Sequence, residues 1–166
     1  MMIIAIAATV CGCVANRPSP KGIDSLTDED IGEMVVLSME KIYRGVNSGR
    51  IARKSPSVRI VAKIKPFEVL NLQNEARAKE IASQLEMRLR KEMFDGGMFF
   101  FPDAPGVPAS GAALQPDCIL TGKLSCKIIE SGGFSTSEFK LKLSTVDART
   151  GIVAWEGNVL IAKVSE

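Results

Sequence analysis

Cysteines and carboxylates are the side chains of this sequence that could carry out chemistry, because its 166 residues include no histidine. Without histidine, Ser-His-Asp and Cys-His mechanisms and histidine-ligated zinc or haem are excluded. The carboxylates Asp28 and Asp30 lie where helix capping accounts for them, with no base, nucleophile or metal ligand nearby in the sequence. Gly96-Gly97 follows a predicted helix rather than opening one, so it is not a phosphate-binding loop. We therefore expect no catalytic residues, no cofactor and no metal, and we expect that the protein is not an enzyme.

Two of the four cysteines, Cys118 and Cys126, lie in the second half of the chain. Both fall on one predicted strand, where eight residues span about 26 Å at the usual rise. A disulfide needs Cα atoms within about 7 Å, so these two thiols cannot bridge each other. We expect both to be packed, free cysteines.

The other two cysteines, Cys11 and Cys13, follow the uncharged apolar segment Met1 to Val10. That segment is too short to span a membrane, for which about 20 residues are needed, but it suits the apolar part of a signal peptide. A small residue directly before a cysteine at the end of such a segment resembles the bacterial lipobox, in which the peptide is cut before the cysteine and the thiol is acylated. This pattern predicts a lipid anchor, such as palmitate, on Cys13.

The segment that follows is polar and contains prolines, which is typical of a flexible linker. We expect a signal peptide at 1–12, a lipidated cysteine and short tether at 13–26, and a folded domain at 27–166. Fully stretched, the tether would reach about 45 Å. The domain would then stay close to the membrane that holds its anchor.

The composition, with 46% hydrophobic and 24% charged residues, is typical of one folded domain. Twenty-one basic residues against 19 acidic ones give a net charge of +2, which offers no general field for nucleic acid. We expect no nucleic-acid partner.

Hydrophobic periodicity predicts two helices and five strands. Thr27 is a suitable N-cap and Asp30 occupies the capping-box position, while Gly45 suits the left-handed residue that ends a helix. The expected helices are Thr27 to Arg44 and Asn74 to Met93, the two expected short strands are Val58 to Lys65 and Met98 to Phe101, and Pro102 to Pro116 is expected to be a loop.

Three long strands are predicted to close the chain as an antiparallel meander, at Asp117 to Ile129, Phe134 to Val146 and Ile152 to Val164. Because only one face of each strand is apolar, that face needs a cover, which the two amphipathic helices can supply. The fold class expected is α+β, with an antiparallel sheet packed against two helices.

The opposite, polar face of the meander carries Lys123, Lys127, Lys140 and Lys142. These lysines could form a docking face for an acidic partner. They could equally be a solvated face whose charges discourage aggregation of sheet edges. The sequence leaves both interpretations open.

The closing segment, Phe139 to Lys163, resembles the last hairpin of the LpoB-type lipoproteins. There a hydrophobic strand is followed by a D-x-x-T-G turn and an [IV]-x-W strand, here Asp147, Thr150, Gly151, Val153 and Trp155. Pro116 to Gly122 is similar to the strand pattern (A/P)-D-Y-x-L-x-G of that family, with Cys118 in place of an aromatic residue. TolB N-terminal-like and CsgG-like domains share the D-x-x-T-G hairpin.

The resemblance implies a lipoprotein on the periplasmic face of the outer membrane. Such a protein binds a bifunctional penicillin-binding protein and activates its synthesis of peptidoglycan, with no catalytic residues of its own. The alternative is a structural or accessory lipoprotein of an envelope assembly or secretion complex, as in CsgG-like proteins. A tether as short as 13–26 further implies a partner that extends toward the outer membrane, or an assembly located there.

Overall fold

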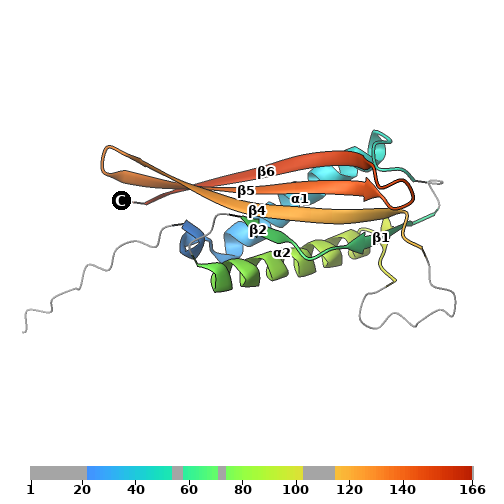
Figure 1. Cartoon of the computed structure of the whole chain (residues 1–166), viewed down its shortest axis with the longest axis horizontal. Coiled ribbons are helices and arrows are strands. Elements are labelled where there is room, and N and C mark those ends of the chain that lie inside the picture. The colour runs from blue at the N-terminus through green and yellow to red at the C-terminus, as the bar shows by residue number, and fades with distance from the viewer. Residues whose placement is uncertain (1–21, 54–57, 71–73, 103–114, 166) are drawn as a thin grey trace, which may run out of the picture.

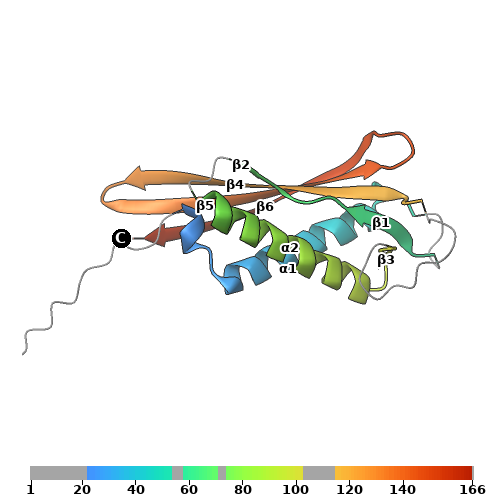
Figure 2. The same ribbon diagram turned by 60° about the horizontal axis from the view of Figure 1, so that its bottom comes forward.

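The fold has two layers, a six-stranded sheet and a pair of helices that cover one of its faces (Figures 1 and 2). This computed structural model describes residues 22–53, 58–70, 74–102 and 115–165. The elements in chain order are η1 (Gly22–Ser25), α1 (Asp28–Asn47), β1 (Ile60–Ile64), β2 (Glu68–Leu70), α2 (Glu75–Asp95), β3 (Phe99–Phe100), β4 (Cys118–Ser131), β5 (Phe134–Asp147) and β6 (Val153–Ser165).

The predicted meander is confirmed, because β4 pairs antiparallel with β5 and β5 antiparallel with β6. The strand order is β3-β1-β4-β5-β6. Strands β1 and β2 lie one after the other along the free edge of β4, both parallel to it, and β3 is parallel to β1. The sheet is therefore mixed: the α+β class is as expected, and the antiparallel pairing holds for β4 to β6 only. Helix α2 makes the crossover that this parallel pairing requires.

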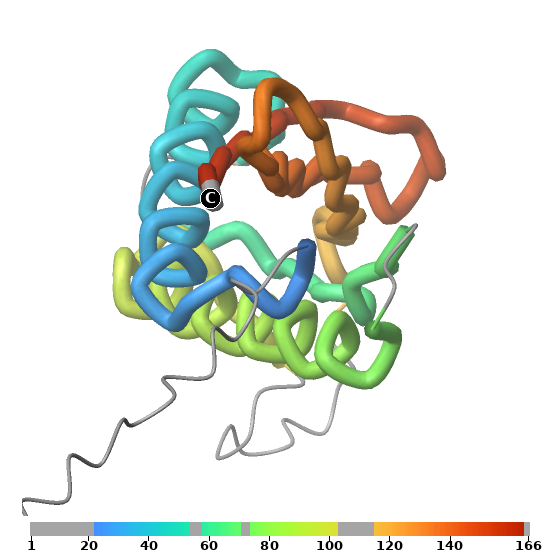
Figure 3. The backbone as a smooth tube through the Cα atoms, turned by 90° about the vertical axis from the view of Figure 1, so that its left-hand side faces the viewer, coloured from blue at the N-terminus to red at the C-terminus, as the bar shows by residue number. Residues whose placement is uncertain are grey.

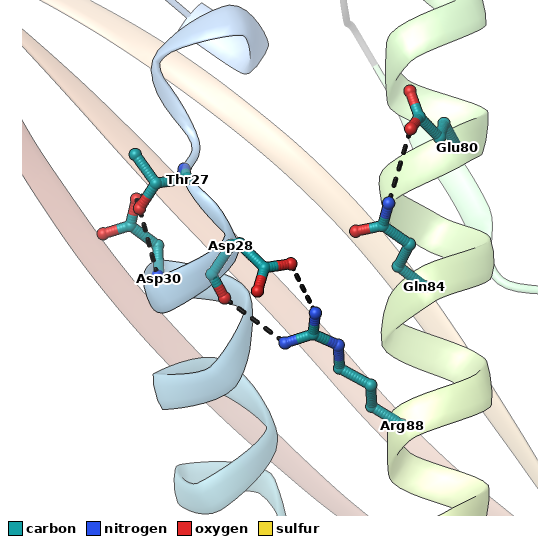
Figure 4. Close-up of polar contacts among 6 residues, drawn as sticks. All are labelled: Thr27, Asp28, Asp30, Glu80, Gln84 and Arg88. Carbon is teal, nitrogen blue, oxygen red and sulfur yellow. Dashed lines mark hydrogen bonds and ion pairs between the residues drawn. The ribbon is translucent and has the colours of Figure 1, made fainter.

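Helix α1 begins as predicted, with a complete capping box (Figure 4). The Asp30 amide donates to the Thr27 hydroxyl at 3.3 Å, and the Thr27 amide donates to the Asp30 carboxylate at 2.6 Å. Arg88 of α2 forms an ion pair with Asp28, and Lys163 of β6 lies 2.7 Å from Asp30. Both carboxylates thus join the first turn of α1 to the rest of the fold.

The end of α1 differs from the expectation, since the helix passes Gly45 and continues to Asn47. The left-handed residue is Gly49, with a φ of 72°. Gly45 is needed for a different reason: a Cβ there would lie 2.8 Å from the indole nitrogen of Trp155. Local sequence predicted that Gly45 ends the helix. In the structure, the missing side chain of Gly45 instead lets Trp155 of β6 approach α1.

The folded domain also begins earlier than expected. The predicted tether ran to Leu26, but Gly22–Ser25 forms the short helix η1, and Ile23 and Leu26 are buried in the core. The predicted signal peptide, Cys13 and the rest of the tether lie outside the described residues.

Other elements match the expected positions closely. Asn74 caps α2 by accepting from the Arg77 amide at 3.2 Å. Strand β3 forms the middle of the predicted apolar strand Met98 to Phe101. The predicted loop lies mostly outside the described residues, which resume at Gln115.

Strand β2 was not predicted. It follows Phe67, whose ring packs so closely on Gly122 that a Cβ at that glycine would lie 2.7 Å from it.

Two glycines of the same helix test the packing of Trp155. Gly45→Ala is expected to lower the free energy of unfolding by about 1–3 kcal/mol, because the added methyl group overpacks the indole. Gly32→Ala is the control, since its nearest contact would be the end of the flexible Arg88 side chain at 4.0 Å. It is expected to stabilise the protein by about 0.5–1 kcal/mol through helix propensity. Urea unfolding measures both; equal changes at the two glycines would contradict the account of Gly45.

Candidate functional site

The candidate functional site is the face of the sheet that the helices leave uncovered, here called the open face. Side chains alternate along the long strands, so that Leu120, Leu124, Leu141 and Leu143 are buried beneath the helices. The residues between them point the other way. All four predicted lysines, Lys123, Lys127, Lys140 and Lys142, lie on the open face.

The structure divides these lysines into two kinds. Lys123 and Lys142 are directly opposite each other in the β4–β5 register. Each is matched with a carboxylate: Lys123 Nζ lies 2.7 Å from Glu68, and Lys142 Nζ lies 2.6 Å from Glu156. The hydrogen bond from Lys142 lowers the pKa of Glu156. These carboxylates offset the repulsion between two like charges placed opposite each other.

Lys127 and Lys140 form no ion pair with any other residue in the described part of the chain. Lys127 is opposite Glu138 in the register, while Lys140 lies between Ser125 and Leu160. Among the four predicted lysines, the available positive charge therefore belongs to Lys127 and Lys140.

The open face also has an apolar part that was not predicted from the sequence. Strand β6 alternates buried Val159 and Ile161 with exposed Leu160 and Val164, so it carries apolar side chains on both faces. The sequence contained a signal for this, because Leu160, Ala162 and Val164 put aliphatic residues at three successive outward positions, which departs from the usual alternation of apolar and polar positions. Exposed apolar side chains beside lysines are typical of surfaces that contact other molecules.

The D-x-x-T-G turn between β5 and β6 is held together by the carboxylate of Asp147. The Asp147 carboxylate accepts from the amides of Arg149 at 3.0 Å and Thr150 at 2.7 Å, and from the Thr150 hydroxyl at 2.9 Å. These bonds, led by the Thr150 amide, hold the pKa of Asp147 below its usual value. Gly151 has a φ of 73°, which favours glycine. This motif builds the turn, and Trp155 beyond it anchors β6 to α1.

Asp117, in the second motif of the resemblance, is a structural clasp. Its carboxylate accepts from the Val61 amide at 2.9 Å, and its own amide donates to the Val61 carbonyl at 2.7 Å. Its carbonyl accepts from the Ala148 amide at 3.1 Å, so one residue joins β1, β4 and the β5–β6 turn. A hollow of about 780 Å³ beside it is lined in part by Arg53 and Arg149.

The cysteines of the domain are free, as expected. Cys118 is buried, and burial raises the pKa of its thiol to about 12. Cys126 is half-buried, and burial raises its thiol pKa as well. Both thiols are thus protonated at neutral pH, which makes them poor nucleophiles.

Residues 22–53, 58–70, 74–102 and 115–165 contain neither a cluster of metal ligands nor a membrane-spanning helix. Over those ranges no three Cys, Asp or Glu side chains come together as metal ligands. Neither long helix of the described domain is apolar enough to cross a bilayer.

No protein-family model matches this chain, and no curated protein matches it in sequence. Solved structures do resemble it. The lipoprotein GNA1162 from Neisseria meningitidis is 15% identical, with a TM-score of 0.43 over 64% of this chain and 84% of that one. The LpoB C-terminal domain from Escherichia coli is 13% identical, with a TM-score of 0.38 over 80% and 98%. The same domain from Salmonella enterica is 12% identical, with a TM-score of 0.37 over 79% and 94%. These values describe a general likeness of shape and carry no argument about function.

The Asp147 turn is expected to be sensitive to acid. Asp147→Ala removes the acceptor of three hydrogen bonds and is expected to lower the free energy of unfolding at neutral pH. Because the folded-state pKa lies below the ordinary value of about 3.9, the carboxylate stabilises the fold above that pH. This contribution disappears as the pH falls through the folded-state pKa, so the difference from wild type should shrink in acid.

Urea unfolding from neutral pH down to about pH 2 measures this dependence. Asp147→Asn is the control, since its amide oxygen can still accept from the turn but does not ionise in this range. The difference in the free energy of unfolding between Asp147→Asn and wild type should change with pH only through the ionisation of Asp147 in wild type. A constant difference between wild type and Asp147→Ala at every pH would contradict the role given to the carboxylate.

Proposed function

We propose that this protein is a lipoprotein, anchored through Cys13 in the outer membrane, that binds a bifunctional penicillin-binding protein and raises its activity. The observation that carries the proposal is the open face, a long sheet surface that no helix of the described chain covers and that carries both free lysines and exposed aliphatic side chains. The resemblance of the Asp147 to Trp155 hairpin to LpoB-type proteins supplies the class of partner.

The protein acts in this proposal by docking and breaks no bond itself. A protein that binds one conformation of an enzyme more tightly than another shifts the enzyme toward that conformation. Lys140 and Leu160 are adjacent across β5 and β6, and Lys127 lies diagonally from Lys140. A complementary partner surface would present carboxylates around an apolar centre.

The reach of the anchor constrains where the partner meets the protein. Since the folded domain begins by Gly22, only the nine residue steps from Cys13 to Gly22 separate it from the lipid. That length is at most about 30 Å when stretched. The synthase is therefore proposed to extend toward the outer membrane.

Charge reversal at the two free lysines tests the docking face. The double variant Lys127→Glu/Lys140→Glu is expected to weaken binding to the purified synthase at least about tenfold, because two attractive contacts become repulsive. Lys79→Glu/Lys91→Glu is the matched control, with the same change of charge on the exposed side of α2. It should bind and stimulate the synthase as wild type does.

Three outcomes would contradict parts of the proposal. Equal binding of both double variants would exclude Lys127 and Lys140 from the interface. A wild-type protein that binds no penicillin-binding protein but does bind another envelope complex would favour the alternative, an accessory role. Peptidoglycan turnover by the purified protein without synthase would show that it is an enzyme.

The anchor is tested separately by metabolic labelling with a radioactive fatty acid. Wild type is expected to take up label and Cys13→Ala to take up none, because acylation needs the thiol. Cys11→Ala is the control and should be labelled as wild type is. Label on Cys13→Ala would place the anchor elsewhere.

A further inference from the structure

The end of the sheet at the β4–β5 turn carries a cluster of exposed apolar side chains, here called the apolar tip: Ile129, Phe134 and Val164. Ile129 and Val164 are neighbours in one cross-strand row, with Thr136 between them. Phe134 begins β5 at the turn, opposite Ser131. The exposed fractions are 37% for Ile129, 51% for Phe134 and 67% for Val164. All three belong to the open face.

The described chain begins at this same end of the sheet, with Gly22 of η1 (Figures 1 and 3). The Gly22 amide donates to the Ser137 hydroxyl at 3.0 Å, in a buried hydrogen bond. A Cβ on Gly22 would lie 3.3 Å from Ile128, so the entry point is packed against both strands of the hairpin. The start of the described chain is therefore held on the helix-covered face, three residues along β5 from Phe134 of the apolar tip, which lies on the open face.

Simple chain dimensions place the apolar tip within reach of the anchoring lipid. From Ser137 to Phe134 the strand advances about 10 Å. The nine residue steps from Gly22 to Cys13 average about 17 Å when flexible and cannot exceed about 30 Å. The anchor thus keeps Gly22 within about 30 Å of the bilayer and the tip within about 40 Å of it, which gives the tip a high effective concentration at the membrane.

We propose that the apolar tip inserts into the interface of the same bilayer that holds the acyl chains of Cys13. The inference rests on the anchor in the proposed function and adds a second contact to it. Ile129, Phe134 and Val164 would enter the boundary between headgroups and acyl chains, about 5–10 Å deep. Lys127 and Glu138, in the adjacent row, would lie at the level of the headgroups.

Insertion at this end decides how the domain stands on the membrane. Strand β4 is 14 residues long, which corresponds to about 46 Å. With its tip in the bilayer, the sheet would hold the β5–β6 turn, and the hollow beside Asp117, up to that distance away from the surface. Lys127 and Lys140 would then lie about 7 and 13 Å along the strands from the inserted row, so a partner would meet this part of the open face close to the membrane.

A tryptophan placed in the apolar tip tests the insertion. The full-length lipidated protein carrying Phe134→Trp is reconstituted in vesicles of phosphatidylethanolamine and phosphatidylglycerol. Its emission, after subtraction of the wild-type Trp155 signal, is expected to shift to the blue and to be quenched about twofold by brominated acyl chains. Ile129→Ser and Val164→Ser in the same background are expected to reduce the quenching.

Ile152→Trp is the matched control, because Ile152 is 67% exposed but lies at the β5–β6 turn, at the opposite end of the sheet. It should show neither shift nor quenching. The thermal unfolding of each variant, followed by circular dichroism, establishes that the protein is folded.

The outcomes separate this inference from the anchor on which it rests. If the Phe134→Trp variant takes up fatty acid but the emission of its added indole is unaffected by brominated lipid, the insertion is overturned and the anchor stays in place. A blue shift without quenching also overturns the insertion and points to contact with a second copy. Wild type that takes up no fatty acid overturns the anchor and the insertion together.

Discussion

The two helices cover one face of this sheet and leave the other face open. The main features of the molecule follow from that constraint. The three long strands carry buried side chains at every second position, and α1 and α2 lie across that side. The other side has no cover within the described chain. Its side chains must therefore be tolerated in water or meet another molecule, and the mixture of lysine, leucine and valine found there suits contact better than simple solvation.

Trp155 shows how the helices and the sheet are joined. Its indole fills the space left by Gly45 on α1 and by Gly157 on β6, where a Cβ would lie 2.8 and 2.6 Å from the ring. The indole of Trp155 thus occupies the space that side chains at Gly45 and Gly157 would fill. Its packing holds α1 against β6, the edge strand of the sheet. The salt bridge from Lys163 to Asp30 makes a second link between the same elements. The tryptophan of the [IV]-x-W pattern is in this way a packing residue.

The two ends of the sheet differ in what they are built for. At one end, Asp117 and Asp147 tie β1, β4 and the β5–β6 turn together with hydrogen bonds. At the other, the β4–β5 hairpin carries apolar side chains into water beside the point where the chain enters the domain. An end tied by hydrogen bonds and an apolar end suit a module that stands on a surface and presents its body to a partner, which is the arrangement we propose.

The sequence by itself determined the elements whose causes are local. The capping box at Thr27, the Asp147 turn and the alternation of β4 and β5 depend on residues close together in the chain, so the two helices, the meander and the faces of the four lysines were predictable. Tertiary structure alone decided what depends on distant neighbours. Position 45 is a glycine because Trp155 packs against it, η1 is ordered because Ile23 is buried in the core, and β1 and β2 are parallel to β4 because α2 carries the chain back. The pairing of Lys123 with Glu68, and of Lys142 with Glu156, likewise needed the strand register, since no local pattern indicates which residue of another strand a side chain will face.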